Sequence, residues 1–248
     1  MIYSNCCYKI STIGATKFDM NTNRRYKTDN SPRRKIGTTR RSVSGLYPFR
    51  GVGPVDFEST LERDFLIRLE TERGVLDVVS QPLTIEFIGS NGQIYPYTPD
   101  YLVTYRAYPA PYRAPVLIEV KPVSELDKYL SEWKVKFRAA MAHCKAHGYL
   151  FHLRHEPRIR DQRWKNAMFL QRYRQMQFVP EESEWIIGNL NQMGTATFDH
   201  LLARHFFGVA DRSRGISHLW YLLATSRIEC DWSQPLSNNS ELWIPEHA

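Results

Sequence analysis

The chain has 248 residues, of which 42% are hydrophobic, and a formal net charge of +7. A chain of this length can bury one substantial core and a smaller one, so we expect one main domain and an appendage. No run approaches the roughly 18–20 consecutive apolar residues of a membrane helix, and the first residues lack the pattern of a signal peptide. These features exclude a membrane protein and predict a cytoplasmic one.

The first 50 residues carry the positive charge. They hold eleven Lys and Arg against two Asp, a net charge of +9, so the rest of the chain sums to −2. The segment is poor in periodic apolar residues and is typical of an arm that binds a polyanion such as nucleic acid. A solvated tail or a protein-docking tail is the alternative. The candidate nucleic-acid-binding residues are Arg33, Arg34, Lys35, Arg40 and Arg41.

A helix and a strand-rich segment are predicted next. Apolar residues at three- and four-residue spacing indicate a helix near residues 57–72. Strands are expected at residues 75–79 and at Leu83–Ile88, where "GSNGQ" then marks a hairpin turn. The strands "YLVTY" and "VLIEV" follow, and together with Leu83–Ile88 they predict a three-stranded meander.

The pattern then changes to the helical period. It predicts a long amphipathic helix from Ser124, as N-cap, to Gly148, followed by a strand at Tyr149–His155 and a helix at residues 158–178. The long helix is expected to be the crossover between two parallel strands, which makes the fold class α/β.

The C-terminal part is predicted to be a separate small domain. "VPEESE" interrupts the apolar periodicity near residue 180, and two short helices with two brief strand candidates follow. This order resembles a winged helix-turn-helix, although it is also a common way to complete any small domain. The expected domains are a basic arm (1–50), a main domain (51–180) and a winged-helix-like domain (181–248).

Two carboxylates and a lysine occur at the ends of adjacent predicted strands. Asp100 begins one strand and Glu119 lies near the end of the next, so the two acids converge if the strands are antiparallel. Glu119 and Lys121 are two residues apart and point to the same face, whereas Val120 points to the other. Such a group can bind a hard divalent cation and stabilise the charge that grows on a phosphate during its hydrolysis. A turn-forming Pro-Asp and an exposed Glu/Lys pair are the structural alternative.

This pattern resembles the PD-(D/E)XK nuclease fold. Within that fold, "ESTLERDFLIRLE", "VVSQPLTIEF", "YTPDYLV", "LIEVKP" and "RIRDQRWKNAMFLQRYR" resemble the TnsA family of transposon endonucleases, over a stretch from about Arg33 to Arg174. The resemblance implies a restriction-endonuclease-like core in which a mixed sheet is flanked by helices.

The resemblance also implies roles for particular residues. Asp100 and Glu119 would bind the metal, the Val120 carbonyl would be a further ligand, and Lys121 would be the active-site lysine. A helical acid should complete the site, either Glu62, which we favour, or Glu58, one helical turn away. Glu62 could instead only close a capping box with Ser59.

The function that the resemblance implies is Mg²⁺-dependent cleavage of the 5′ strands at transposon ends, with Mn²⁺ able to substitute. The expected partners are double-stranded DNA, the transposase subunit TnsB and the AAA+ regulator TnsC, in association with the bacterial nucleoid. Two alternatives stay open: a free-standing junction resolvase or restriction-type nuclease of the same fold, and a non-catalytic DNA-binding scaffold.

Overall fold

The computed structural model describes residues 43–50, 53–106 and 113–245. The candidate nucleic-acid-binding residues Arg33, Arg34, Lys35, Arg40 and Arg41 lie outside the described residues. The chain divides into two units. The first comprises the described residues up to Arg63 and Gly74–Glu156, and the second comprises Asp64–Arg73 and the described residues from Pro157 onward.

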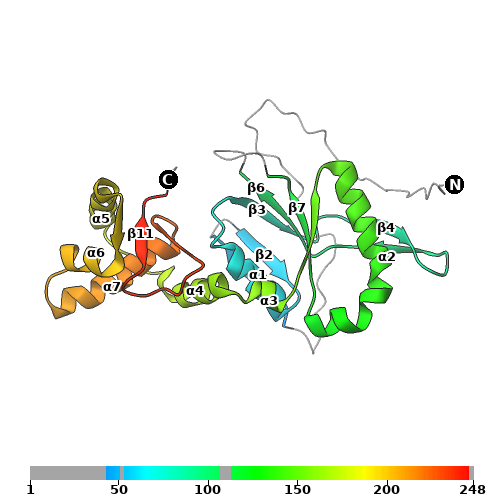
Figure 1. The fold of residues 1–248 in the computed structure, drawn as a ribbon, viewed down its shortest axis with the longest axis horizontal. Helices are drawn as coiled ribbons and strands as arrows, with labels where there is room; N and C mark the ends of the chain where they lie inside the picture. The colour runs from blue at the N-terminus through cyan, green and yellow to red at the C-terminus, as the bar shows by residue number, and fades with distance from the viewer. Residues whose placement is uncertain (1–42, 51–52, 107–112, 246–248) are drawn as a thin grey trace, which may run out of the picture. The chain divides into compact units, whose positions relative to one another are not determined.

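A four-stranded mixed sheet forms the centre of the first unit (Figure 1). Its order is β3 (Val75–Ser80), β6 (Tyr101–Tyr105), β7 (Val116–Val120) and β8 (Leu150–Arg154). The β3–β6 and β6–β7 pairs are antiparallel, whereas β7 and β8 are parallel. Every residue of β7 is buried, as expected for a central strand covered on both faces. The predicted α/β class and parallel crossover are confirmed.

Helix α2 (Val123–His147) provides this crossover and packs on the sheet. Its buried residues Phe137 and Ala140 form a core cluster with Leu117 of β7. The helix ends at Gly148, whose left-handed φ of 71° suits glycine, as predicted. The predicted start was wrong by two residues: the N-cap is Pro122, whose φ of −60° and ψ of 145° already lead into the first turn.

The predicted three-stranded meander is wrong. Strand β4 (Ile85–Ile88) does not join the main sheet but pairs with β5 (Ile94–Tyr97) in a separate two-stranded hairpin. The predicted Asn-Gly turn connects these two strands, and β5 begins two residues after its glycine, at Ile94. Pro96 within β5 hides this strand from sequence analysis, because proline is tolerated only in strands at a sheet edge. The place beside β6 is taken by β3.

The last part of the predicted arm is folded. Strand β1 (Gly45–Phe49) pairs antiparallel with β2 (Gly53–Phe57), and Tyr47 and Phe49 are buried. Helix α1 follows at Thr60–Leu69, within the predicted range. The division between the two units falls inside this helix.

Helices dominate the second unit. The helix predicted at residues 158–178 is broken into α3 (Glu156–Ile159), α4 (Gln162–Leu170) and the 3-10 turn η1 (Gln171–Tyr173). The break has a local cause, since the Asp161 side chain accepts a hydrogen bond of 3.1 Å from the Trp164 amide and starts a new helix.

The remaining elements have the order of a winged helix: α5 (Pro180–Met193), β9 (Thr195–Thr197), α6 (Phe198–His205), α7 (Val209–Ala224), β10 (Glu229–Cys230) and β11 (Glu241–Trp243). The strands form an antiparallel sheet in the order β10–β11–β9. The expected winged-helix-like arrangement is confirmed, and the sequence analysis missed α5. The predicted domain limits stay a prediction; the division in the structure groups residues 157–180 with these elements. Among the described helices, none has the length and apolar character that crossing a membrane requires.

Candidate active site

The ends of β6 and β7 bring the predicted acids together. Tyr101 of β6 pairs with Ile118 of β7 in the antiparallel register, which places the preceding Asp100 beside the following Glu119. The Val120 amide donates a hydrogen bond of 2.6 Å to Oδ2 of Asp100 and so ties the two strand ends to each other. The convergence expected from the sequence is therefore present.

The ammonium of Lys121 lies among three oxygens from these strand ends. Its Nζ is 3.0 Å from the Val120 carbonyl oxygen, 3.2 Å from Oε1 of Glu119 and 3.6 Å from Oδ2 of Asp100. These oxygens come from three of the four residues that the sequence analysis expected to bind a metal, and here they surround a positive charge. Two carboxylates and a carbonyl are the hard oxygen ligands that Mg²⁺ takes in proteins, so the residues fit such an ion.

The closeness of the acids changes the pKa values of the cluster. Burial, followed by the neighbouring charge of Glu119, raises the pKa of Asp100 well above its usual value, and Lys121 and the Val120 amide only partly oppose this. Burial disfavours the Lys121 ammonium, but the Asp100 and Glu119 carboxylates outweigh it and raise the pKa of Lys121. Lys121 is therefore a charged donor and not a base at neutral pH.

Glu62 is held by other partners than this contact group. Its carboxylate accepts hydrogen bonds from the Glu58 amide (2.8 Å), the Ser59 hydroxyl (2.9 Å) and the Tyr101 hydroxyl (3.3 Å). The Ser59 hydroxyl in turn accepts from the Glu62 amide, which is one half of a capping box, while the carboxylate bonds to the amide of Glu58 in place of that of Ser59. The charge of Glu62 still acts on the pKa of Asp100, which it raises further, so the helical acid and the strand acids interact electrostatically.

The pKa of Glu62 is nevertheless affected by the cluster. Burial is the main cause that raises its pKa, and the charge of Lys121 acts in the opposite direction. The other candidate, Glu58, accepts a hydrogen bond of 3.0 Å from the Gln81 side chain. Within the described residues, no three His, Cys, Asp or Glu side chains are grouped closely enough to hold a metal ion. The role of either helical acid as a ligand stays a prediction.

Two residues that the sequence analysis missed hold Glu119. The Tyr97 hydroxyl donates to Oε2 at 2.8 Å, and Lys136 Nζ donates to Oε1 at 3.2 Å. Tyr97 belongs to the overlooked strand β5, and Lys136 lies on α2, on which the sequence analysis had considered only the apolar face. The signal for Lys136 was its place beside Trp133 and Phe137, next to the buried stripe.

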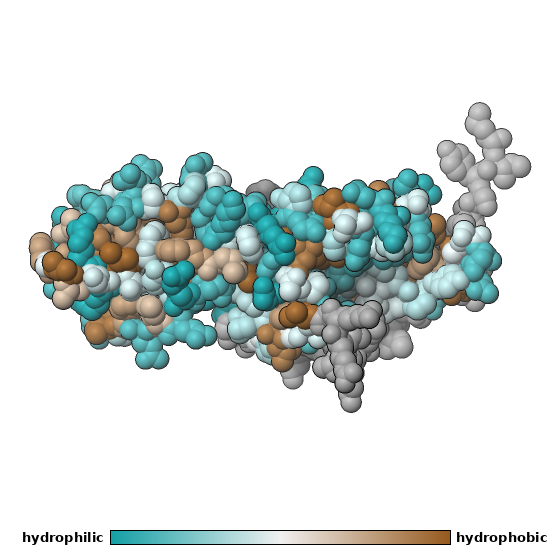
Figure 2. Space-filling model, turned by 90° about the horizontal axis from the view of Figure 1, so that it is seen from below, coloured by the Kyte–Doolittle hydropathy of each residue, from teal (hydrophilic) through white to brown (hydrophobic). Residues whose placement is uncertain are grey.

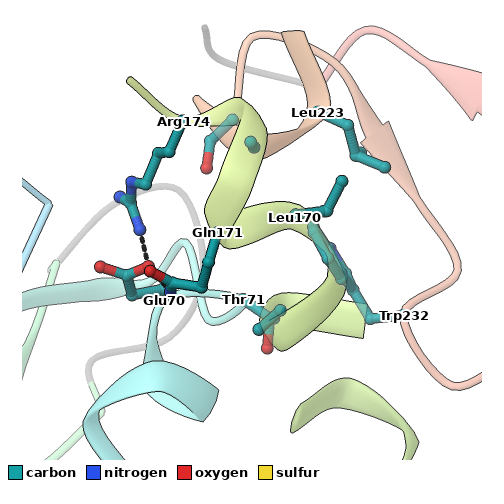
Figure 3. A pocket seen from close by; sticks show the side chains of 10 residues that line it. Glu70, Thr71, Leu170, Gln171, Arg174, Leu223 and Trp232 are labelled. Carbon is teal, nitrogen blue, oxygen red and sulfur yellow. Dashed lines mark hydrogen bonds and ion pairs between the residues drawn. The ribbon is translucent and has the colours of Figure 1, made fainter. Parts of the chain in front are cut away.

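A small cavity in the second unit is separate from this cluster (Figure 3). Its volume is about 20 Å³, and its lining includes Leu170, Leu223 and Trp232, with Glu70 and Arg174 forming an ion pair. This volume is enough for about one water molecule. The cavity is too small for a nucleotide or a peptide side chain.

The fold and the cluster together define a class of protein. A mixed sheet with a crossover helix, whose adjacent strand ends bring Asp100, Glu119 and Lys121 together, is the arrangement of a PD-(D/E)XK nuclease. Two family models match the chain: the TnsA-like endonuclease N-terminal model at residues 72–156 and the TnsA endonuclease C-terminal model at residues 158–232. The chain belongs to the TnsA family, and it is an endonuclease subunit of a transposition complex that acts on DNA. A comparison with curated proteins gave no match.

Proposed function

We propose that this protein hydrolyses the 5′ strands at the ends of a transposon in a reaction that depends on Mg²⁺, with Mn²⁺ able to substitute. The observation that carries the proposal is the convergence of Asp100, Glu119 and the Val120 carbonyl on a single positive charge, the ammonium of Lys121.

The residues of the cluster divide the work. Asp100, Glu119 and the Val120 carbonyl would hold the ion, and Glu62 is the further candidate ligand from α1. When bound, a divalent cation supplies Lewis-acid polarisation of the scissile phosphate and neutralises developing charge. The Lys121 ammonium, once released from the acids, would donate hydrogen bonds that orient the attacking water or stabilise a phosphate oxygen. The basic residues Arg33, Arg34, Lys35, Arg40 and Arg41 would contact the DNA backbone, with binding that weakens as salt rises.

The second unit offers a surface for a protein partner. The arginines at the start of α7 are already paired, Arg212 with Asp199 at 2.5 Å and Arg214 with both carboxylate oxygens of Glu182 at 2.7 and 2.8 Å. Large apolar side chains are exposed in the same unit: Trp185, Phe207 and Val209. Figure 2 shows hydrophobic residues among hydrophilic ones on this unit, at the left of the view. Compensated charge and exposed apolar area favour docking of a protein, for which TnsB and TnsC are the candidates, over docking of a phosphate backbone.

The test is a reconstituted cleavage reaction. The protein, its transposase subunit, labelled transposon-end DNA and Mg²⁺ are combined, and nicks on each strand are mapped. We expect 5′-strand nicks with wild-type protein and none with Asp100→Ala or Lys121→Ala, while DNA binding is retained. Cleavage by the protein alone would favour a free-standing nuclease. Unchanged nicking by Lys121→Ala would contradict the assignment of the site.

A further inference from the structure

Glu119 is the most enclosed acid of the cluster, and its two oxygens have different partners. Its side chain is 2% exposed. Oε2 accepts from the Tyr97 hydroxyl at 2.8 Å, whereas Oε1 lies 3.2 Å from both the Lys121 and the Lys136 ammonium groups. Glu119 therefore contacts a second ammonium, that of Lys136, in addition to the Lys121 ammonium that the three oxygens surround.

Lys136 is fixed in a way that Lys121 is not. Its Nζ lies 4.7 Å from the ring centroid of Trp133, 4.8 Å from that of Tyr97 and 5.1 Å from that of Phe137. Each aromatic face attracts a cation, and the attraction is stronger where water is excluded. Trp133 and Phe137 are on the same helix as Lys136, and Phe137 is buried against the sheet. The three rings form an aromatic cage, meaning Tyr97, Trp133 and Phe137 around one ammonium.

Lys121 has no aromatic partner among the described contacts of its ammonium. It contacts the oxygens that would bind a divalent cation, so a cation held by these oxygens would take the place of the ammonium. Displacement would leave Glu119 without an organising contact unless other groups hold it. Tyr97 and Lys136 are placed to do so, because neither contacts Asp100 or the Val120 carbonyl in the described structure.

We propose that Tyr97 and Lys136 are positioning residues for Glu119, which keep its carboxylate oriented and its charge compensated while Lys121 moves to the substrate. This inference rests on the proposed function, because Glu119 is taken as a ligand of the cation. Partners of metal ligands contribute in this way elsewhere, and their loss costs about 10–100-fold in metal affinity or activity.

Tyr97→Phe tests the inference without any activity measurement. It removes only the hydroxyl that donates to Oε2 and retains the ring of the aromatic cage. Mn²⁺ binding is titrated by calorimetry in the absence of DNA, and we expect about tenfold weaker binding than in the wild type. Tyr95→Phe is the matched control, because the hydrogen bonds of the Tyr95 hydroxyl within the described residues go to Asn91 and Gln93 of the same hairpin. Equal affinity of Tyr97→Phe and wild type would overturn the inference.

Lys136→Met is tested by nicking, because losing its charge also makes the site more attractive to cations, and a binding titration would mix the two effects. We expect kcat to fall about tenfold or more with KM for DNA unchanged, and Lys136→Arg to recover part of the loss. The control is Lys134→Met, an exposed lysine on the same helix. Melting curves verify that each variant is folded. Wild-type kcat in Lys136→Met would overturn the role of this residue.

The two proposals fail separately. Absence of nicking by wild-type protein would refute the proposed function, yet the Mn²⁺ titrations of wild type and Tyr97→Phe would still decide whether the pair positions Glu119. Wild-type nicking combined with unchanged behaviour of Tyr97→Phe and Lys136→Met would refute only the further inference.

Discussion

Replacing Lys121 by Met should separate the structural and catalytic contributions of its charge. In the structure, the ammonium lies 3.2 Å from Oε1 of Glu119 and 3.6 Å from Oδ2 of Asp100. At an effective dielectric constant of about 20, each of these contacts is worth about 5 kcal/mol in Coulomb energy before desolvation is subtracted. Removing one partner of a buried ion pair typically costs about 3–5 kcal/mol, because the other charge is left unpaired.

The expected loss for Lys121→Met is smaller than that range. Lys136 still compensates Glu119, the Val120 amide still bonds to Asp100, and the Asp100 side chain is 19% exposed and therefore partly solvated. We expect the free energy of unfolding to fall by about 2 kcal/mol, which lowers the melting temperature by about 4–8 °C.

The assay is thermal unfolding with and without Mg²⁺ or Mn²⁺. A divalent cation that takes the place of the ammonium should raise the melting temperature more in Lys121→Met than in wild type, because in the variant it no longer competes with a bound charge. Lys134→Met serves as a control for the loss of a lysine. Melting of Lys121→Met at the wild-type temperature, or an equal effect of the cation on both proteins, would refute this account of the site.

Two further predictions concern stability. The pKa of Asp100 is raised by burial and by Glu119, so the stability linked to this group is present below the usual pKa of about 3.9 and lost as pH rises through the folded value. Asp100→Asn should therefore melt above wild type at neutral pH, with the difference vanishing in acid, while nicking is lost. In α7, a Cβ on Gly215 would lie 2.4 Å from the Phe206 ring, so Gly215→Ala should lower the free energy of unfolding by about 1–2 kcal/mol. In α5, a Cβ on Gly188 would meet nothing within 4 Å, so Gly188→Ala should raise the free energy of unfolding by up to about 1 kcal/mol in the same melting assay.

The sequence predicted what depends on local pattern. The β6 and β7 strands, the crossover helix and the parallel β8 strand follow from apolar periodicity and from the rule that such crossovers link parallel neighbours. The convergence of Asp100 and Glu119 follows in turn, because the antiparallel pairing of two consecutive strands sets which ends meet. These features required no knowledge of packing between distant segments.

The errors have the opposite character. Pro96 concealed β5, and without β5 there was no reason to place Tyr97 beside Glu119, 22 residues away along the chain. Lys136 contacts Glu119 because α2 lies over the sheet at a particular rotation about its axis. The apolar stripe shows which face of the helix meets the sheet, but it does not show which polar side chain at the edge of that face reaches Glu119. The capping box at Ser59–Glu62 was visible in the sequence, but its contact with Tyr101 was not.

The acids stay together because the strands that carry them cannot move apart. Tyr101, Leu117 and Ile118, the neighbours of Asp100 and Glu119 in β6 and β7, are at most 2% exposed and are held in the sheet by packing on both faces. On a mobile loop the carboxylates of Asp100 and Glu119 could move apart, but the sheet keeps them close. Burial, together with their repulsion, disfavours the charged form of Asp100 and raises its pKa. Stability and nuclease chemistry are therefore opposed at Asp100, and a variant that gains stability by neutralising this residue should lose the ability to hold a cation.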